Sequence, residues 1–304
     1  MLLHLHDGGG DVVFACIVRE VDGGKADVTT PYGYGGPVVA GPDPPVESFW
    51  REYERWCENG GVVTTFLRFH PLYANQRAAA PYVRVETLAG TIAWRLDQGD
   101  LFEGMHRHHR RIVRKAEAAG LQGSLAAAPE SLDRFVRLYE QTMERKDASG
   151  FYYFPREYWH TLEAGLRERV VLFEAGEDAA LLCFAARPWL HYHLGATSEE
   201  GRKLGASNFL FLEAARWAAA EGFTRFHLGG GVGGGADSLF EFKRRFDPAG
   251  VVEMAVGKAV HDEAAYRALT GGGSGAAGFF PAYRSAAGRS LDGWRRVNDD
   301  APTQ

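Results

Sequence analysis

The sequence predicts a mixed α/β fold in which helices flank a sheet of mixed strand direction. Short apolar runs rich in β-branched residues alternate with longer segments of helical periodicity, most regularly over residues 132–246. Some of these runs are separated only by short turn-like stretches, which indicates hairpins. The order of elements in the two halves of the chain is loosely similar, which suggests a duplicated domain.

The N-terminal part is expected to contain several strands and one helix. Residues 49–59 have helical periodicity, and the Gly60–Gly61 pair suits the end of a helix. Residues 29–37, TTPYGYGGP, form a Gly- and Pro-rich loop that carries Tyr32 and Tyr34. The expected strands are residues 12–18, 62–69, 83–88 and 91–96, of which the last two would form a hairpin around Gly90.

Helices and strands alternate through the remainder of the chain. Gly120 is placed to end the helix at residues 101–119, and Gly222 the helix at residues 208–221. Residues 270–278 are Gly-rich and are expected to form a mobile loop, after which residues 279–284 should pack back on the protein. The expected helices are residues 101–119, 132–146, 158–166 and 208–221, and the expected strands are residues 170–174, 179–187, 189–194 and 225–228.

A lysine falls on the apolar side of the last predicted helix. Ser238 and Glu241 form a capping-box pair, so a helix should begin there. Lys243 lies within its apolar stripe, where a cation costs free energy unless a polar or negative group meets it. That group could be a substrate; alternatively, the lysine stem packs while its ammonium reaches water. The apolar stripe consists of Leu239, Phe242 and Phe246.

A strongly basic segment lies about a third of the way along the chain. Residues 106–115, HRHHRRIVRK, contain five Arg or Lys and three His residues with no acid. Arg107, Arg110 and Arg114 share one helical face, flanked by Arg111 and Lys115. Because like charges at this spacing repel, the segment suits a polyanionic partner such as RNA or a diphosphate. Alternatively, acids from elsewhere in the chain balance an exposed basic face.

Two glycine-containing segments could hold a ligand. Residues 202–207, RKLGAS, partly match the R-x-x-G-x-G/A pattern with which acetyl-CoA enzymes of the GNAT fold bind pyrophosphate. The alternative is a helix entry with Ser207 or Asn208 as N-cap. Residues 228–235, LGGGVGGG, follow a predicted strand, and their bare backbone would let a ligand approach closely. A flexible loop is the alternative there.

Composition and missing motifs exclude several classes of protein. The net charge of -5 and the pI of about 6.1 argue against a protein that coats nucleic acid with its whole surface. Isolated Cys16, Cys57 and Cys183 indicate a reducing, cytoplasmic location, as does the lack of a signal peptide or a long apolar run. His191 and His193 share one strand face, but no metal site is predicted.

Several segments together resemble Fem-type aminoacyltransferases. FYYFPREYW, YHLGATSEEGRK, the Asn208-led helix, HLGGG and SLFEFKRRF occur in the order found in that family. HRHHRRIVRKAEAAGL resembles its basic interdomain segment, and TPYGYGGP resembles a loop of its N-terminal domain. The resemblance covers most of residues 29–246. The chain lacks the long helical hairpin of some cross-bridge enzymes and so resembles the compact form.

The resemblance implies an α/β (α+β) fold with two GNAT-like domains, each a mixed twisted sheet flanked by helices. Residues 1–104, completed by residues 250–304, would form the N-terminal domain, and residues 105–249 the catalytic domain. Fem-type enzymes transfer an amino acid from aminoacyl-tRNA to an amine. The implied partners are therefore aminoacyl-tRNA, as a co-substrate, and a small amine or peptide acceptor, with no cofactor and no membrane span.

The resemblance also implies roles for individual residues. The Phe-Lys pair of the family matches Phe242 and Lys243, whose ammonium would stabilise an oxyanion. No residue matches the family's N-terminal phosphate-binding lysine, which favours a small acceptor. The implied acceptor-binding residues are Arg145, Lys146, Tyr153, Tyr192, His193, Tyr32 and Tyr34. The implied tRNA- or donor-binding residues are Arg107, Arg110, Arg111, Arg114, Lys115, Arg202, Lys203, Asn208, Gly229, Gly230 and Gly231.

Three hypotheses about function remain open at this point. The leading one is an aminoacyl-tRNA-dependent transferase that forms an amide bond. The second is an acyl-CoA-dependent GNAT N-acyltransferase, which RKLGAS favours. The third is a non-catalytic GNAT-like binding module, in which Lys243 would be dispensable.

Overall fold

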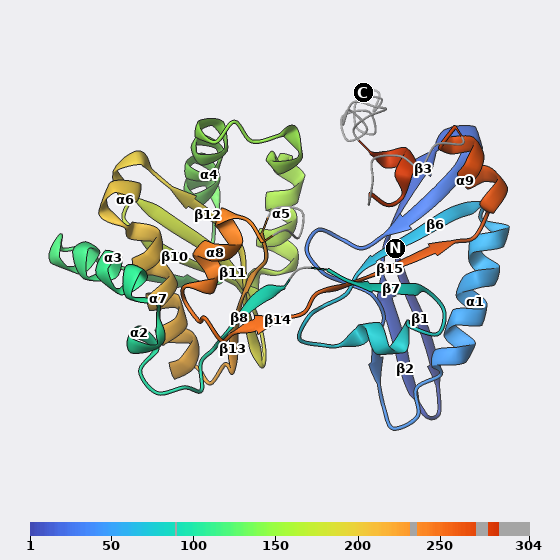
Figure 1. Cartoon of the computed structure of the whole chain (residues 1–304), viewed down its shortest axis with the longest axis horizontal. Helices are drawn as coiled ribbons and strands as arrows, with labels where there is room; N and C mark the ends of the chain where they lie inside the picture. Colours follow the sequence, from blue (N-terminus) through green and yellow to red (C-terminus); the bar gives the residue numbers. More distant parts are fainter. Residues whose placement is uncertain (89, 232–235, 272–278, 286–304) are drawn as a thin grey trace. The chain divides into compact units, whose positions relative to one another are not determined.

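The computed structural model describes residues 1–88, 90–231, 236–271 and 279–285. The chain divides into two compact units (Figure 1). Unit 1 comprises Met1–Leu88 and Glu253–Gln304, and unit 2 comprises Ala89–Val252. Among the described helices, none is long and apolar enough to cross a membrane.

The described part of unit 1 contains two sheets and a long helix. A crossover through α1 lets β4 and β6 pair in parallel, and β15 pairs antiparallel with both β6 and β7. The C-terminal part of the chain therefore supplies an inner strand of this sheet, whose order is β3-β4-β6-β15-β7. The elements are β1 (Leu2–Asp7), β2 (Gly10–Ala15), β3 (Ile17–Val21), β4 (Lys25–Thr29), β5 (Val38–Ala40), α1 (Val46–Asn59), β6 (Val62–Arg68), β7 (Arg84–Thr87), β15 (Ala255–Val260) and α9 (Glu263–Leu269).

Residues 279–285 pack back on unit 1, as the sequence predicted. The Phe280 ring lies 6.1 Å from the Phe66 ring and 6.0 Å from the Tyr266 ring. Arg284 Nε donates a 2.9 Å hydrogen bond to Asp27 Oδ2, and Arg19 Nε donates one of 2.7 Å to Oδ1. Asp27 is fully buried, so two guanidinium groups offset the cost of holding its carboxylate away from water.

The Asp27→Ala variant should lose about 3–5 kcal/mol of unfolding free energy, because Arg19 and Arg284 would be left without their buried counter-charge. Urea unfolding would measure the loss. Glu47→Ala removes an exposed partner of Arg51 and should cost under about 1 kcal/mol. Similar losses of unfolding free energy in the two variants would show that the buried ion pairs of Asp27 stabilise the fold no more than an exposed pair does.

Unit 2 contains a seven-stranded sheet among its described residues, in the order β14-β8-β13-β12-β11-β10-β9. Its helices are α2 (Leu101–Gly104), α3 (Arg107–Ala118), α4 (Asp133–Arg145), α5 (Arg156–Gly165), α6 (Glu199–Leu204), α7 (Ala206–Ala220) and α8 (Ser238–Arg244). Its strands are β8 (Thr91–Arg95), β9 (Ser124–Ala127), β10 (Val170–Ala175), β11 (Ala179–Ala186), β12 (Trp189–Thr197), β13 (Arg225–Gly229) and β14 (Val251–Val252).

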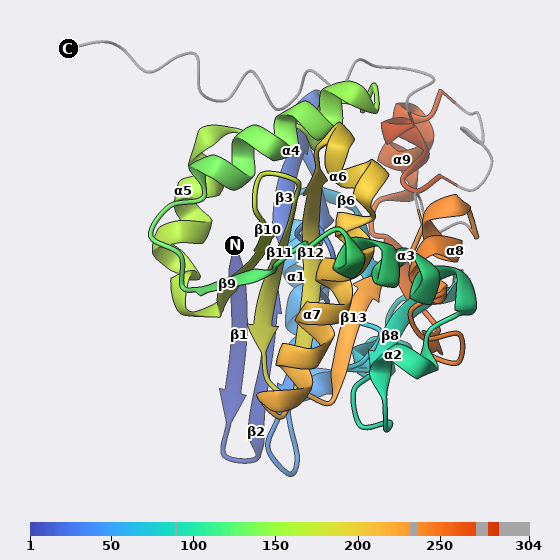
Figure 2. The same cartoon turned by 90° about the vertical axis from the view of Figure 1, so that its left-hand side faces the viewer.

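Helices pack on both faces of the unit 2 sheet. One core gathers apolar residues of α2, α3, α7 and α8, with Phe211, Phe240 and Phe246 among them. The other core lies under α4 and α5 and includes Phe135 and Trp159. Helices α3 and α7 lie side by side on the first face (Figure 2). α7 is apolar on most of its surface because it packs between the sheet and α3.

The only parallel pair among the described strands of this sheet is β12 with β13, which α7 connects. The two strands pair only from Trp189–Arg225 to His191–His227. β12 continues to Thr197 without β13 beside it. The two strands therefore separate after His191. Beyond that point, no residue of β12 is paired with a residue of β13.

Several local expectations are wrong, each because of long-range pairing or capping. Residues 83–88 and 91–96 form no hairpin: β7 pairs with β15 in unit 1, and β8 pairs with β13 in unit 2. Unit 2 accordingly takes β8 and α2, although residues 1–104 were assigned to the first domain. The expected strand at residues 12–18 is split between β2 and β3, which join different sheets.

The predicted helix at residues 101–119 is also two helices. Asp100 caps α2 by accepting hydrogen bonds from Phe102 N and Glu103 N, and α3 begins after His106. Local sequence patterns did not predict the following elements: β1, β4, β5, β9, β14, β15, α6 and α9. Most of these are short or lack a periodic apolar pattern, so they depend on neighbouring elements. The expected mobile loop at residues 270–278 lies almost wholly outside the described residues.

Candidate functional site

Helix α8 begins one residue earlier than the capping-box pattern predicted. Asp237 is the N-cap, and its carboxylate accepts a 2.8 Å hydrogen bond from Phe240 N. Glu241 turns away and pairs with Arg244 at 2.7 Å. Asp and Ser are both good N-caps, so only the backbone geometry decides between these adjacent residues. Leu239 is 38% exposed and does not belong to the apolar stripe, whereas Phe240 is buried.

Lys243 is buried together with its ammonium group. The residue is 6% exposed, and Nζ donates a 2.8 Å hydrogen bond to the carbonyl of Gly230. The ammonium also lies over the Tyr192 ring, 5.5 Å from its centroid. The alternative of a lysine that reaches water is therefore wrong. Because burial disfavours the charged form, the pKa of Lys243 falls to about 8, although the charge of Asp237 raises it.

The Lys243 ammonium is charged at neutral pH, and not all of its N–H groups donate a hydrogen bond to a described residue. At pH 7 a group with this pKa is about nine-tenths protonated. An ammonium has three N–H donors, and within the described residues only the bond to Gly230 is formed. The remaining donors can meet a negative oxygen on a ligand. A buried cation with free donors suits the stabilisation of an oxyanion that develops during a reaction.

Two glycines, one bonded to Lys243 and one against Tyr192, leave little room for a side chain. A Cβ on Gly230 would lie 3.2 Å from the carbonyl oxygen of Gly90, and one on Gly195 would lie 2.5 Å from the Tyr192 hydroxyl. Tyr192 projects from β12 just where that strand leaves β13, and its ring packs 4.9 Å from Phe211. Gly229 and Gly231 flank the carbonyl that binds Lys243, and residues 232–235 lie outside the described part.

Phe242 packs in the core beneath the lysine. Its ring lies 5.9 Å from Phe211 and 5.0 Å from His109, and its carbonyl faces the imidazole of His109. His109 lies inside the basic segment, and the sequence analysis did not single it out. A sequence pattern could have identified it, because helical spacing places His109 on the same side as Val113 and Ala116, which are both buried.

The predicted acceptor-binding residues do not form one group. His193 bonds to the Tyr158 hydroxyl and packs 4.5 Å from Phe184, on the α5 side of the sheet, whereas Tyr192 faces α7. Burial lowers the pKa of His193 to about 4, so it is neutral. Tyr153 is exposed near α5, and Tyr32 and Tyr34 belong to unit 1. Tyr192 and His193 therefore do not line one cavity.

Two other acceptor candidates lie close together at the C-terminal end of α4. Arg145 donates to the carbonyl of Thr197 at the end of β12. Desolvation, and then the charges of Arg145 and Arg202, lower the pKa of Lys146. These three cations therefore gather near the entry to α7, where the Thr197 and Ser207 hydroxyls are 2.6 Å apart. Such a group attracts an anion.

The basic helix α3 presents its charges differently from the predicted face. Arg110 bonds to Glu103 at 2.7 Å, and Arg114 lies over the Phe102 ring. Arg107, Arg111 and Lys115, spaced four residues apart, form an exposed row. Arg107 and Arg111 make no ion pair with any described residue, whereas Lys115 Nζ donates a 2.6 Å hydrogen bond to the carbonyl of Lys203. The two arginines are therefore available to a polyanion, and Lys115 extends the same row.

The RKLGAS segment is helical on both sides of Gly205. Arg202 and Lys203 belong to α6, and Gly205 joins α6 to α7 with a φ of 82°. A Cβ on Gly205 would lie 2.3 Å from the Cγ2 atom of Ile112 on α3, so helix packing by itself requires this glycine. Asn208 is buried in the first turn of α7, and its Nδ2 has no partner within the described part.

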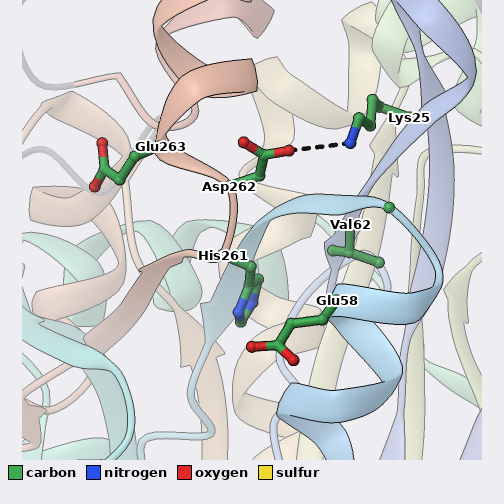
Figure 3. A pocket seen from close by; sticks show the side chains of 7 residues that line it. Lys25, Glu58, Val62, His261, Asp262 and Glu263 are labelled. Carbon is green, nitrogen blue, oxygen red and sulfur yellow. Dashed lines mark hydrogen bonds and ion pairs between the residues drawn. The ribbon is translucent and has the colours of Figure 1, made fainter.

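A separate pocket of about 330 Å³ lies in unit 1 (Figure 3). The pocket contains none of the predicted site residues, and a 3.0 Å ion pair joins Lys25 to Asp262 at its edge. No group of described residues could hold a metal ion. The pocket is lined by Lys25, Glu58, Gly61, Val62, His261, Asp262 and Glu263.

Part of unit 2 is similar to a known family of protein domains. Residues 104–244 match the family described as "Acetyltransferase (GNAT) domain". This range includes α3, α7 and α8, and hence Lys243. No curated protein sequence matches the chain.

Solved structures share the fold of the chain over most of its length. FemX is 13% identical with a TM-score of 0.62, covering 88% of this chain and 90% of that one. The C-terminal domain of a putative lysylphosphatidylglycerol synthetase from Agrobacterium fabrum is 14% identical, with a TM-score of 0.59 and coverage of 87% and 84%. L-PGS from Bacillus licheniformis is 18% identical, with a TM-score of 0.56 and coverage of 84% and 83%. The mixed α/β GNAT fold and the resemblance to Fem-type proteins are confirmed.

Proposed function

We propose that this chain transfers an amino acid from aminoacyl-tRNA to an amine and forms an amide bond. The observation that carries the proposal is the buried, charged Lys243, which is held by the Gly230 carbonyl where β12 and β13 part. Two similar structures support the proposal: FemX, whose name links it to the Fem-type proteins that the sequence resembles, and a putative lysylphosphatidylglycerol synthetase, whose name denotes the making of a lysyl-bearing product.

The proposed step needs no nucleophile from the protein. The acceptor nitrogen attacks the carbonyl carbon of the ester, and the carbonyl oxygen becomes an oxyanion that the Lys243 ammonium stabilises by a hydrogen bond. The C–O bond to the tRNA ribose then breaks, and the amide remains. The proton lost by the amine ends on the ribose oxygen, so charge and atoms balance. Aminoacyl-tRNA is a co-substrate, and no cofactor takes part.

The cations of unit 2 supply the binding surfaces that this proposal needs. Arg107, Arg111 and Lys115 would contact the phosphates of the tRNA. Arg145 and Lys146 would contact an anionic group of the acceptor, and Tyr192 would lie against the reacting groups, since its ring faces Lys243. A small amine or peptide is the proposed acceptor class.

A donor screen tests the proposal. Charged total tRNA and a panel of acyl-CoAs are offered separately with a mixed pool of amines, and products are read by mass spectrometry. We expect aminoacylated amines from charged tRNA only, and none after the charged tRNA has been treated with RNase. Full activity after RNase treatment would contradict the proposal. RNA binding without turnover of any donor would instead favour a non-catalytic module.

A second candidate is acyl-CoA-dependent N-acylation, favoured by the unpaired Asn208 amide at the start of α7. A helix N-terminus with an additional donor suits a pyrophosphate. This candidate requires acetyl-CoA to protect the protein against thermal unfolding, and Arg202→Ala to abolish that protection. The packing of Gly205 against Ile112 weakens this candidate, because it explains the glycine without a ligand.

A further inference from the structure

Helix α3 has an inner face that contacts α8, in addition to its basic outer row. His109 lies on that inner face and is 1% exposed. Its ring centroid lies 4.5 Å from that of Phe246 and 5.0 Å from that of Phe242. Its Nε2 lies 2.8 Å from the carbonyl oxygen of Phe242, the residue that precedes Lys243. A polar ring in this aromatic core would cost free energy without such a bond.

The end of α8 explains why Phe242 needs an outside donor. In a regular α-helix, the amide of residue 246 would donate to the carbonyl of residue 242. Here Phe246 N donates instead to Lys243 O, at 3.1 Å, because the last turn tightens. The carbonyl of Phe242 therefore has no helical partner, and His109 satisfies it. A buried carbonyl left without a donor costs about 1–3 kcal/mol.

A second hydrogen bond joins the same two helices on the other side of the lysine. His106 N donates to the carbonyl of Arg245 at 2.9 Å. The residues at both ends of the Phe242–Arg245 segment are thus bonded to the first turn of α3. Lys243 lies between these two attachments, and its ammonium reaches Gly230 from a backbone that cannot shift freely.

The protonation state of His109 agrees with its role as a donor. The carbonyl of Phe242 can only accept, so Nε2 carries the hydrogen, and Nδ1 has no partner within the described residues. The pKa of His109 is lowered to about 4, mainly by burial; the bond to Phe242 opposes this shift, and the charges of Arg245, His108 and His106 add to it. The ring is therefore neutral at physiological pH, and its Nε2–H donates a hydrogen bond to the carbonyl of Phe242.

We propose that His109 is a positioning residue, which holds the Phe242 carbonyl and thereby keeps the Lys243 ammonium buried against Gly230, on the same helix that carries the basic row. This inference rests on the proposed function for the role of Lys243. His109 acts through the backbone of α8 and touches no reacting group. The helix that would bind the donor and the helix that carries the lysine form one hydrogen-bonded pair.

Two substitutions separate the hydrogen bond from the aromatic packing. His109→Phe keeps the ring contacts with Phe242 and Phe246 but removes the donor. His109→Gln removes the ring but places an amide N–H close to the position of Nε2. We expect kcat to fall about 10-fold in His109→Phe, the cost of one hydrogen bond of about 1.4 kcal/mol. The KM for the donor should stay within about two-fold, and His109→Gln should recover most of kcat.

The ionisation of Lys243 provides a readout that does not depend on turnover. The pH dependence of Lys243 acetylation by acetic anhydride, followed by mass spectrometry, should have its midpoint at about 8 in the wild type. Because a less constrained ammonium gains water, the midpoint should move upward in His109→Phe, while the contribution of Asp237 stays unchanged. His108→Phe, the same change one residue earlier at a side chain with no hydrogen bond to α8, should leave it unchanged.

Three outcomes decide the matter. A wild-type midpoint and a wild-type kcat in His109→Phe would overturn the proposal. So would a His109→Gln variant that is folded but as impaired as His109→Phe, because the ring and not the donor would then matter. If the midpoint moves as expected while the wild type uses no aminoacyl donor, the positioning role of His109 stands and the proposed function fails.

Discussion

Replacing Lys243 by methionine should lower kcat by about 100- to 1,000-fold, which is the usual effect of losing one donor to an oxyanion. The methionine side chain keeps the length and apolar stem of lysine, so the packing with Tyr192 should persist. KM for the donor should change little, because the interaction is made mainly in the transition state. Single-turnover kinetics with purified aminoacyl-tRNA would measure the loss.

The same substitution should make the protein more stable at neutral pH. Burial lowers the pKa of Lys243 from 10.5 to about 8, so the protonated form is disfavoured in the folded state. That shift corresponds to about 3 kcal/mol, and the loss of the bond to Gly230 offsets about 1 kcal/mol. The folded protein binds fewer protons than the unfolded chain between pH 8 and 10.5, so the gain is full below pH 8 and fades as the pH rises to 10.5.

Loss of activity together with a gain in stability would identify a functional residue and not a folding defect. Lys25→Met, at a half-exposed lysine of unit 1 that pairs with Asp262, serves as the matched control and should change neither quantity by much. A Lys243→Met variant that keeps activity within a few-fold would contradict the proposed role of the ammonium. It would then favour a binding module in which the lysine is dispensable.

Reversing the charges of the exposed row on α3 should weaken donor binding without changing the chemical step. We expect the triple variant Arg107→Glu, Arg111→Glu, Lys115→Glu to raise the KM for aminoacyl-tRNA by about 10- to 100-fold at low salt. Each phosphate contact adds about 0.7–0.9 to the slope of log affinity against log salt, so the loss of three contacts should lower the slope by two to three. Binding of labelled tRNA at several salt concentrations would measure it.

A matched control for this variant lies on α1 of unit 1. Arg51 and Arg55 are comparably exposed, but each already pairs with an acid on its own helix. Arg51→Glu combined with Arg55→Glu should leave both tRNA affinity and the salt slope unchanged. An unchanged salt slope in the α3 variant would show that the tRNA binds another surface. Rates measured at saturating donor concentration would report the chemical step separately from binding.

Much of unit 2 could be predicted because its elements carry strong local signals. The periodic segments at α4, α5 and α7 and the apolar runs at β10, β11 and β12 are long enough to identify from the sequence. The position of Lys243 on a buried side followed from helical spacing alone. The basic character of α3 was equally visible, although Arg110 and Arg114 turned out to face Glu103 and Phe102.

The partners of the site residues could not be predicted in the same way. Tyr192 and His193 are neighbours on β12 and project to opposite sides of the sheet, as strand alternation requires. Which helices cover each side is decided by the tertiary structure: Tyr192 packs on the α7 side and His193 on the α5 side. The hydrogen bond from His109 to Phe242 joins residues far apart in the chain. Within the basic segment, helical spacing places His109 on the side of Val113 and Ala116, but only the packing of α3 against α8 supplies the carbonyl that it binds.

The sequence by itself therefore determined which segments form the main helices and strands, and that one lysine would lie among apolar residues, because helical and strand periodicity are local properties. Tertiary structure alone decided that β7 and β8 belong to different sheets, that the Gly230 carbonyl meets the ammonium and that His109 holds the helix beside it. These outcomes depend on contacts between distant residues, whose free energy arises only when the chain is folded and water is excluded.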